Sequence, residues 1–130
     1  MDLIMNIRSL RFLPVLMLGC LLSNAAAAET TEWMSGKDAF PRADKLRTFG
    51  MIVTRMDCKD SGQRSLDVDS ALVRMHYTRN TKMLDWRIDG WNHLQENKDY
   101  WAERGYTLAF HTVFVRKTSG LRLYCTVYNK

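Results

Sequence analysis

Hydrophobic and polar residues alternate with a period of two in several stretches of this 130-residue chain. Such a period places successive side chains on opposite faces of a β-strand. In residues 71–78, for example, Ala71, Val73, Met75 and Tyr77 share one face. The same reasoning predicts five strands, over residues 51–58, 71–78, 83–88, 106–115 and 121–128. The fourth of these is apolar on both faces, which is typical of a central position in a sheet.

One helix is predicted between the third and fourth strands, beginning at Trp91 or Asn92 and ending at Arg104. Asn92 suits the N-cap position, with Gln95 three residues later in the arrangement of a capping box. Gly105 follows as the glycine that commonly ends a helix. The resulting order, β-β-β-α-β-β, predicts an α+β domain in which one helix packs across one antiparallel sheet of about five strands.

The segment ahead of these elements, residues 29–47, has a different character. It is polar, contains Gly36 and Pro41, and shows no sustained hydrophobic period. We therefore expect a flexible, poorly ordered lead-in, followed by a single small domain over residues 48–130. No internal repeat is visible in the sequence.

The first 28 residues have the organisation of a secretory signal peptide. Arg8 and Arg11 precede an apolar run over residues 12–22, and four alanines follow at positions 25–28. Positive charge, apolar run and small-residue cleavage site, in this order, are typical of exported proteins. Cleavage after Ala28 would release a periplasmic or secreted domain.

Two alternative interpretations of this leader stay open. Gly19 before Cys20 suits a lipoprotein whose lipidated N-terminus is Cys20, although Leu18 is bulky and the alanine run is then unexplained. A membrane anchor would need about 20 apolar residues, and this run has 11. We favour the cleaved peptide.

Beyond the leader, the chain contains two cysteines, Cys58 and Cys125. Disulfides form and persist in the compartments to which exported proteins travel. Two cysteines allow one intramolecular pairing, and we expect this disulfide. Two free thiols and an intermolecular bond are the alternatives.

The charge of the chain bears on its partners. Without Arg8, Arg11 and Asp2 of the leader, the net charge is +4. No run of five basic residues occurs, so a nucleic-acid partner is not expected. A positive net charge together with tryptophans leaves open the binding of an anionic glycan or lipid head group.

No residue spacing predicts catalysis, a metal site or a cofactor. His76, His93 and His111 are 17 and 18 residues apart, and neither His-x-x-x-His nor Cys-x-x-Cys occurs. A Gly-x-Ser-x-Gly nucleophile motif is missing from the sequence as well. Asp85 and Asp89 could pair as acid and base, but aspartates beside a strand end are more typical of turns and caps. We therefore expect a non-catalytic protein without cofactor or metal.

Aromatic and basic residues predict a partner-binding surface instead. Arg122, Tyr124 and Tyr128 alternate on one face of the last predicted strand. Trp86 forms a group with Trp91 and Trp101 near the helix. Tyr, Trp and Arg are enriched in binding hot spots. We expect the three residues of the last strand, together with Trp86, to contact another envelope or extracellular protein, as in an inhibitor, an immunity factor or a host-interaction factor. A purely structural envelope protein is the remaining alternative.

The end of the chain carries a further pattern. A helix containing Trp101 is followed by Gly105-Tyr106 and by a hairpin that ends in Tyr128-x-Lys130. This pattern resembles one unit of the bacterial tandem-repeat domain built around a Gly-Tyr pair. The resemblance covers about 40 residues and implies a helix-hairpin fold there, without a defined chemistry.

Overall fold

The computed structural model describes residues 27–64 and 70–130. The predicted signal peptide, with Cys20 inside it, lies almost wholly outside these ranges, so it stays a prediction. Among the helices of the described ranges, none has the length and apolar character needed to cross a membrane.

The described chain has two helices and seven strands, and the predicted α+β class is confirmed. In chain order they are β1 (Glu29–Thr30), β2 (Met34–Ser35), α1 (Gly36–Thr48), β3 (Met51–Asp60), β4 (Ala71–Arg79), β5 (Trp86–Trp91), α2 (Leu94–Ala102), β6 (Thr107–Val115) and β7 (Arg122–Asn129). The five strands from β3 onward overlap the five predicted ones.

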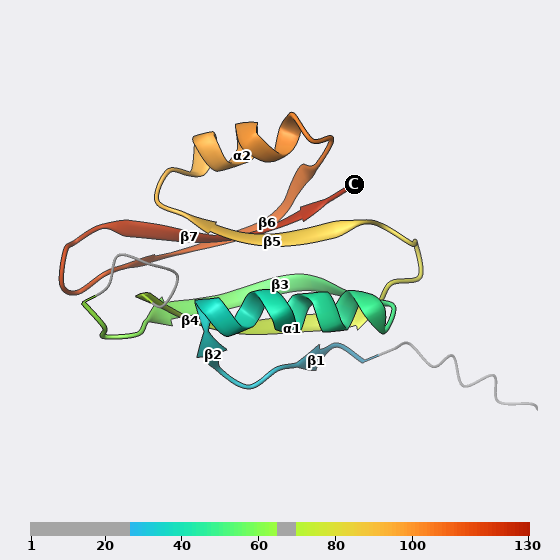
Figure 1. Ribbon diagram of the computed structural model, residues 1–130, viewed down its shortest axis with the longest axis horizontal. Helices are drawn as coiled ribbons and strands as arrows, with labels where there is room; N and C mark the ends of the chain where they lie inside the picture. Colours follow the sequence, from blue (N-terminus) through green and yellow to red (C-terminus); the bar gives the residue numbers. More distant parts are fainter. Residues whose placement is uncertain (1–26, 65–69) are drawn as a thin grey trace, which may run out of the picture.

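The strands form two antiparallel sheets, whereas we expected one. In sheet A, β4 pairs with β3 along one edge and with the short β1 and β2 along the other. Sheet B has the order β5-β7-β6. Figure 1 shows the two sheets as stacked layers, with α2 on the side of sheet B away from sheet A. The alternation of residues within a strand determines its two faces but not the strands that pair with it. It could therefore not distinguish one five-stranded sheet from two smaller sheets.

The central strand of sheet B is β7, and β6 lies at an edge. The expectation that residues 106–115 occupy a central position is therefore wrong. Along β6, Val113 and Val115 point to solvent and are 48% and 54% exposed. The inward face of β6 packs on the core through Phe110 and Phe114. The second apolar face of β6 is therefore formed by valines that are exposed at the edge of the sheet, and not by residues buried in its centre.

The lead-in expected over residues 29–47 is also corrected, because most of it forms α1. Ser35 caps this helix, and its hydroxyl accepts a hydrogen bond from the Asp38 N–H at 3.1 Å. Three small or aliphatic residues follow at helical spacing and are buried in the core: Ala39, Ala43 and Leu46. Pro41 lies inside the helix, where a proline cannot donate the backbone hydrogen bond to Lys37 and its ring crowds the carbonyl of that residue.

Helix α2 is shorter than predicted. It begins at Leu94, and its N-cap is His93, whose side chain makes no capping hydrogen bond, so Asn92 is not the cap. Gly105 has a φ of 83°, as expected for the glycine that ends this helical segment. The residue of α2 that is fully buried is Asn97, which a search for an apolar stripe does not find.

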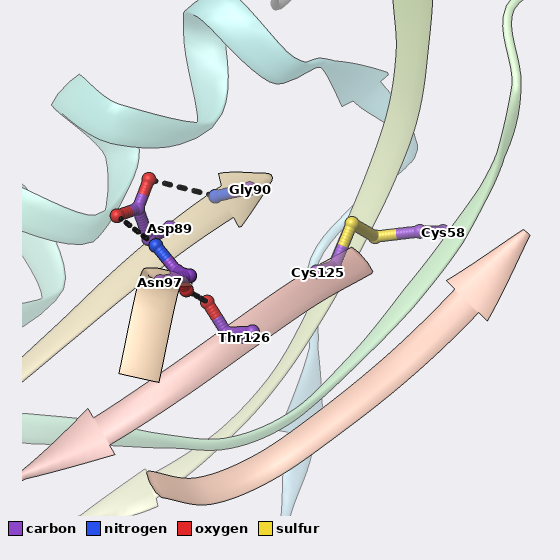
Figure 2. The surroundings of a disulfide bond; sticks show 6 residues. All are labelled: Cys58, Asp89, Gly90, Asn97, Cys125 and Thr126. Carbon is purple, nitrogen blue, oxygen red and sulfur yellow. Dashed lines mark hydrogen bonds between the residues drawn. A yellow bond between two sulfur atoms is a disulfide. The ribbon is translucent and has the colours of Figure 1, made fainter. Parts of the chain in front are cut away.

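The predicted disulfide is present in the structure and joins the two sheets. Cys58 lies on β3 and Cys125 on β7, with their Cα atoms 6.6 Å apart. Figure 2 shows this bond bridging the space between the two strands. Cys125 belongs to the single core cluster that also contains residues of α1, β4 and β5.

A repeat that the sequence did not reveal is visible in the structure. Each helix is followed by a glycine with positive φ and then by an antiparallel hairpin. We call α1–β3–β4 the first unit, with Gly50 at φ 71°, and α2–β6–β7 the second unit, with Gly105 at φ 83°. A positive φ is readily adopted by glycine, so both helices end by the same local chemistry.

The two hairpins also share an irregularity. In the first unit the register shifts after Val53, and in the second after Leu108, each three residues beyond the glycine. The residues opposite these two positions are Tyr77 and Tyr128. The same bulge at the same offset makes the two units structural counterparts.

Candidate functional site

Two of the four predicted contact residues are buried. Trp86 is 1% exposed, and its indole N–H donates to the Met51 carbonyl at 2.9 Å. Tyr128 is 0% exposed beneath α2. The prediction that both residues belong to an exposed contact surface is therefore wrong in this structure. Alternation places Tyr128 on the outer face of β7, but it does not reveal that α2 covers this end of the face.

The other two predicted residues lie beyond the part of sheet B that α2 covers. Arg122 is exposed at the start of β7. Tyr124 is half-buried and lies opposite Trp91 of β5 on one side and Val113 of β6 on the other. The predicted surface is thus reduced to Arg122 and Tyr124, with Trp91 beside them.

Asp89 organises a network of hydrogen bonds under α2. Its carboxylate accepts from the Gly90 N–H at 2.8 Å, from the Asn97 side-chain amide at 2.9 Å and from the Trp101 indole at 2.7 Å. Figure 2 shows the first two of these bonds. A carboxylate with three such donors is suited to hold β5 and α2 together, and not to the acid-base pair considered for Asp85 and Asp89.

Asn97 extends this network to β7. Its side-chain oxygen accepts from the Thr126 hydroxyl at 3.0 Å and from the Tyr128 hydroxyl at 2.5 Å. All three side chains are fully buried. Burial raises the pKa of the Tyr128 phenol to about 12, because an apolar environment disfavours its charged form.

Asp85, the other residue of the acid-base pair considered above, contacts different residues. Asp85 accepts a hydrogen bond from the Tyr106 hydroxyl at 2.6 Å and pairs with Arg87 at 2.5 Å. The bond from Tyr106 and the charge of Arg87 hold the pKa of Asp85 below its ordinary value. Asp85 is thus kept ionised beside a cation.

A groove lies between the two helices along the free edge of β5. It has a volume of about 440 Å³, and four aromatic residues line it, of which three are exposed. These are Phe40 of α1 at 39%, Trp91 of β5 at 40% and Tyr100 of α2 at 43%. We call this site the aromatic groove. In Figure 1, β5 runs between α1 below and α2 above.

Arginines surround these aromatic side chains. Arg47 and Arg87 line the groove. The Arg104 guanidinium lies 3.5 Å from the centre of the Tyr100 ring, a cation–π arrangement in which the charge and the ring attract each other. The groove therefore presents Trp, Tyr and Arg together, the residue types enriched in binding hot spots.

Side chains of the protein itself cap the free edge of β5. The Trp86 carbonyl accepts from Arg47 at 3.3 Å, and the Gly90 N–H donates to Asp89 at 2.8 Å. An open strand edge would invite pairing with another strand. These caps favour recognition through the aromatic side chains over the addition of a strand.

A second polar cluster lies on the outer face of sheet A. Asp57 accepts from Arg74 at 2.8 Å and from His76 at 2.7 Å. The His76 hydrogen bond, with that of Arg74, holds the pKa of Asp57 below its ordinary value. Exposed Arg55 lies 3.4 Å from His76, and exposed Lys59 lies over the Trp33 ring at 4.1 Å. Three basic side chains, Arg55, Lys59 and Arg74, thus lie around Asp57.

Sequence reasoning missed much of the aromatic groove. Phe40 was assigned to a lead-in, although its neighbours Ala39 and Ala43 repeat at helical spacing and could have revealed α1. Trp91 and Trp101 were grouped near the helix, but Tyr100 was not singled out. The aromatic side chains of the groove come together only because α1 packs beside β5, and no local sequence pattern predicts this packing.

The described ranges contain no group of three or more His, Cys, Asp or Glu side chains arranged to hold a metal ion. Comparison of the chain with protein-family models, with curated proteins and with solved structures finds no match.

Proposed function

We propose that this protein is a small, exported, non-catalytic interaction protein that binds another envelope or extracellular protein through the aromatic groove. The observation that carries the proposal is the convergence of Phe40, Trp91 and Tyr100 from three elements, each 39–43% exposed. Large aromatic side chains are ordinarily covered when they serve packing alone, and protein interfaces concentrate them.

The placement of these side chains supports the proposal further. The network of Asp89 and Asn97 holds α2 on sheet B, and α1 packs into the core. The groove walls are therefore preorganised, which lowers the entropy cost of binding. Tyr124, from the surface predicted by sequence, lies beside Trp91 and extends the contact area.

The test is in-cell cross-linking of a C-terminally tagged chain, with mass spectrometry of the captured proteins. We expect one dominant partner, and we expect Trp91→Ala combined with Tyr100→Ala to reduce its capture at least about tenfold, as for loss of hot-spot residues. The matched control is Phe49→Ala, because Phe49 is 74% exposed and does not line the groove.

Thermal unfolding of each variant checks that the fold is retained. Equal capture by the double variant and by Phe49→Ala would contradict the assigned groove. Failure to enrich any protein above an untagged control would contradict the proposed function itself.

The basic face of sheet A favours a second candidate function, the binding of an anionic glycan or lipid head group. Arg55, Lys59 and Arg74 project there around Asp57, and Trp33 supplies an aromatic surface. Such binding would weaken steeply as ionic strength rises. Binding to envelope fractions that is insensitive to salt would count against it.

A further inference from the structure

An apolar cavity lies between the two sheets, next to the aromatic groove but distinct from it. Its volume is about 430 Å³. Side chains from both sheets line it, among them Met56 and Val73 of sheet A and Phe114 and Leu123 of sheet B. Cavities that bind small molecules commonly measure about 300–1,000 Å³ and have a mainly apolar lining.

The cavity is accessible from solvent, because three large residues of its lining are exposed. Phe40, Trp91 and Leu121 are 39%, 40% and 43% exposed. Phe40 and Trp91 also line the aromatic groove. Ala71, Leu121 and Leu123 line the cavity alone, and Tyr100 lines the groove alone. The two sites can therefore be altered separately.

The lining indicates the charge of the occupant. Among the described residues that form it there is no lysine, arginine or histidine. Its acidic residue, Asp89, already accepts hydrogen bonds from Gly90, Asn97 and Trp101. An anionic group placed deep among these described residues would have no basic side chain beside it, which is unfavourable.

The volume indicates the size of the occupant. A heavy atom with its hydrogens occupies roughly the share of a water molecule in the liquid, about 30 Å³. A cavity of about 430 Å³ then holds roughly a dozen heavy atoms. We propose that this cavity binds a neutral, apolar small molecule, of the size of a medium-chain alcohol, as a site additional to the partner contact of the aromatic groove.

The test uses naphthalen-1-amine, a neutral fluorophore with as many heavy atoms as decan-1-ol, whose emission shifts to shorter wavelength when it leaves water. We expect saturable binding with one site per chain, and displacement by decan-1-ol. Decanoate, which has the same chain length with a carboxylate, should need at least about tenfold higher concentration, because its charge finds no partner in the cavity. Equal displacement by both compounds, or no saturable binding, would overturn the proposal.

A pair of variants locates the bound probe. Ala71→Phe adds bulk inside the cavity and should weaken probe binding at least about tenfold by filling it. Val113→Phe adds the same ring on the outer face of sheet B, where Val113 is 48% exposed, and should change binding less than about twofold. If Ala71→Phe binds the probe as well as the unaltered chain, the probe lies elsewhere and the proposal fails.

The alcohol–carboxylate comparison needs no variant, so it decides the question even if Ala71→Phe does not fold. The outcome is also independent of the proposed function. Tyr100→Ala alone tests the partner contact, because Tyr100 lies outside the cavity, whereas Ala71 lies outside the groove. Loss of partner capture with retained displacement by decan-1-ol would separate the two sites.

Discussion

The two helix-hairpin units use the same local chemistry and place their helices differently. In both, a glycine with positive φ ends the helical segment, and a bulge follows three residues later. Yet α1 packs into the core through Ala39, Ala43 and Leu46, whereas α2 lies on the outside of sheet B and buries Asn97. The local signals determine the unit, and the residues buried by each helix determine where it packs.

The different positions of the two helices create a groove on the surface. The small side chains of α1 allow it to approach sheet A closely, and the polar network of α2 fixes it on the opposite layer. Strand β5, which belongs to neither unit, runs between them. The aromatic groove therefore exists because the two helices of equivalent units occupy non-equivalent positions.

The largest expected effect concerns the bond that joins the units. Cys58 and Cys125 are separated by 67 residues, and closing a loop of this length stabilises a fold by about 4 kcal/mol in the chain-entropy description. Replacing both cysteines with alanine should lower the free energy of unfolding by about that amount, measured by urea denaturation. A loss below about 1 kcal/mol would show that the remaining contacts already hold the units together.

Next in size is the polar contact of α2. Asn97→Ala removes the partner of Asp89, Thr126 and Tyr128. Buried groups left without partners cost about 1–3 kcal/mol each, so we expect a destabilisation of about 3 kcal/mol. Asn92→Ala is the matched control, since Asn92 is exposed and should change stability by less than about 0.5 kcal/mol. If Asn97→Ala and Asn92→Ala lower the free energy of unfolding by similar amounts, buried polar contacts do not hold α2 in place, and this would contradict the proposed difference between the two helices.

The tyrosines at the two bulges differ in burial, and the pH dependence of stability tests this difference. Tyr128 has a pKa of about 12 in the folded chain, against about 10 for an unfolded tyrosine. Between these values the unfolded chain has lost its proton and the folded chain has not, so stability falls as pH rises. Below about pH 10 the contribution of Tyr128 is fully present.

We expect the Tyr128→Phe variant to lack most of this alkaline loss of stability, measured by urea denaturation between pH 9 and pH 11, a range chosen around the tyrosine pKa of about 10. Tyr77→Phe is the control from the first unit. The Tyr77 pKa is raised mainly by its hydrogen bond to Glu29, and this side chain is only half-buried. An equal effect of the two substitutions would contradict the deeper burial assigned to Tyr128.

The smallest expected effects test the equivalence of the two glycines. Gly50→Ala and Gly105→Ala each force alanine into a positive φ, at 71° and 83°, and should each destabilise by about 1 kcal/mol. An added Cβ meets nothing within 4 Å at Gly50 and the flexible Lys130 side chain at Gly105. Gly90→Ala is the control without positive φ. No difference between it and the other two would contradict the shared helix ending.

The sequence predicted features that depend on neighbouring residues. The five main strands follow from alternation, and the disulfide follows from two cysteines in a chain whose leader predicts export. Helix α1 was missed because Gly36 and Pro41 suggested a loop, although Ala39 and Ala43 lie at helical spacing. The resemblance to the Gly-Tyr repeat unit stays a prediction.

Features that depend on distant contacts could not be predicted. Whether Tyr128 is exposed depends on where α2 packs, and whether five strands form one sheet or two depends on their pairing. The aromatic groove combines both, because it needs α1 and α2 on either side of β5. Only one of its three exposed aromatic residues, Trp91, was singled out before the structure placed it there.

The central claim is that the aromatic groove binds a protein partner, and site-specific photo-crosslinking in cells tests it most directly. A benzophenone amino acid is introduced at position 100, inside the groove, or at position 49, which is exposed outside it. We predict a discrete cross-linked species from position 100 and none from position 49. The same species from both positions, or none from position 100, would contradict the claim.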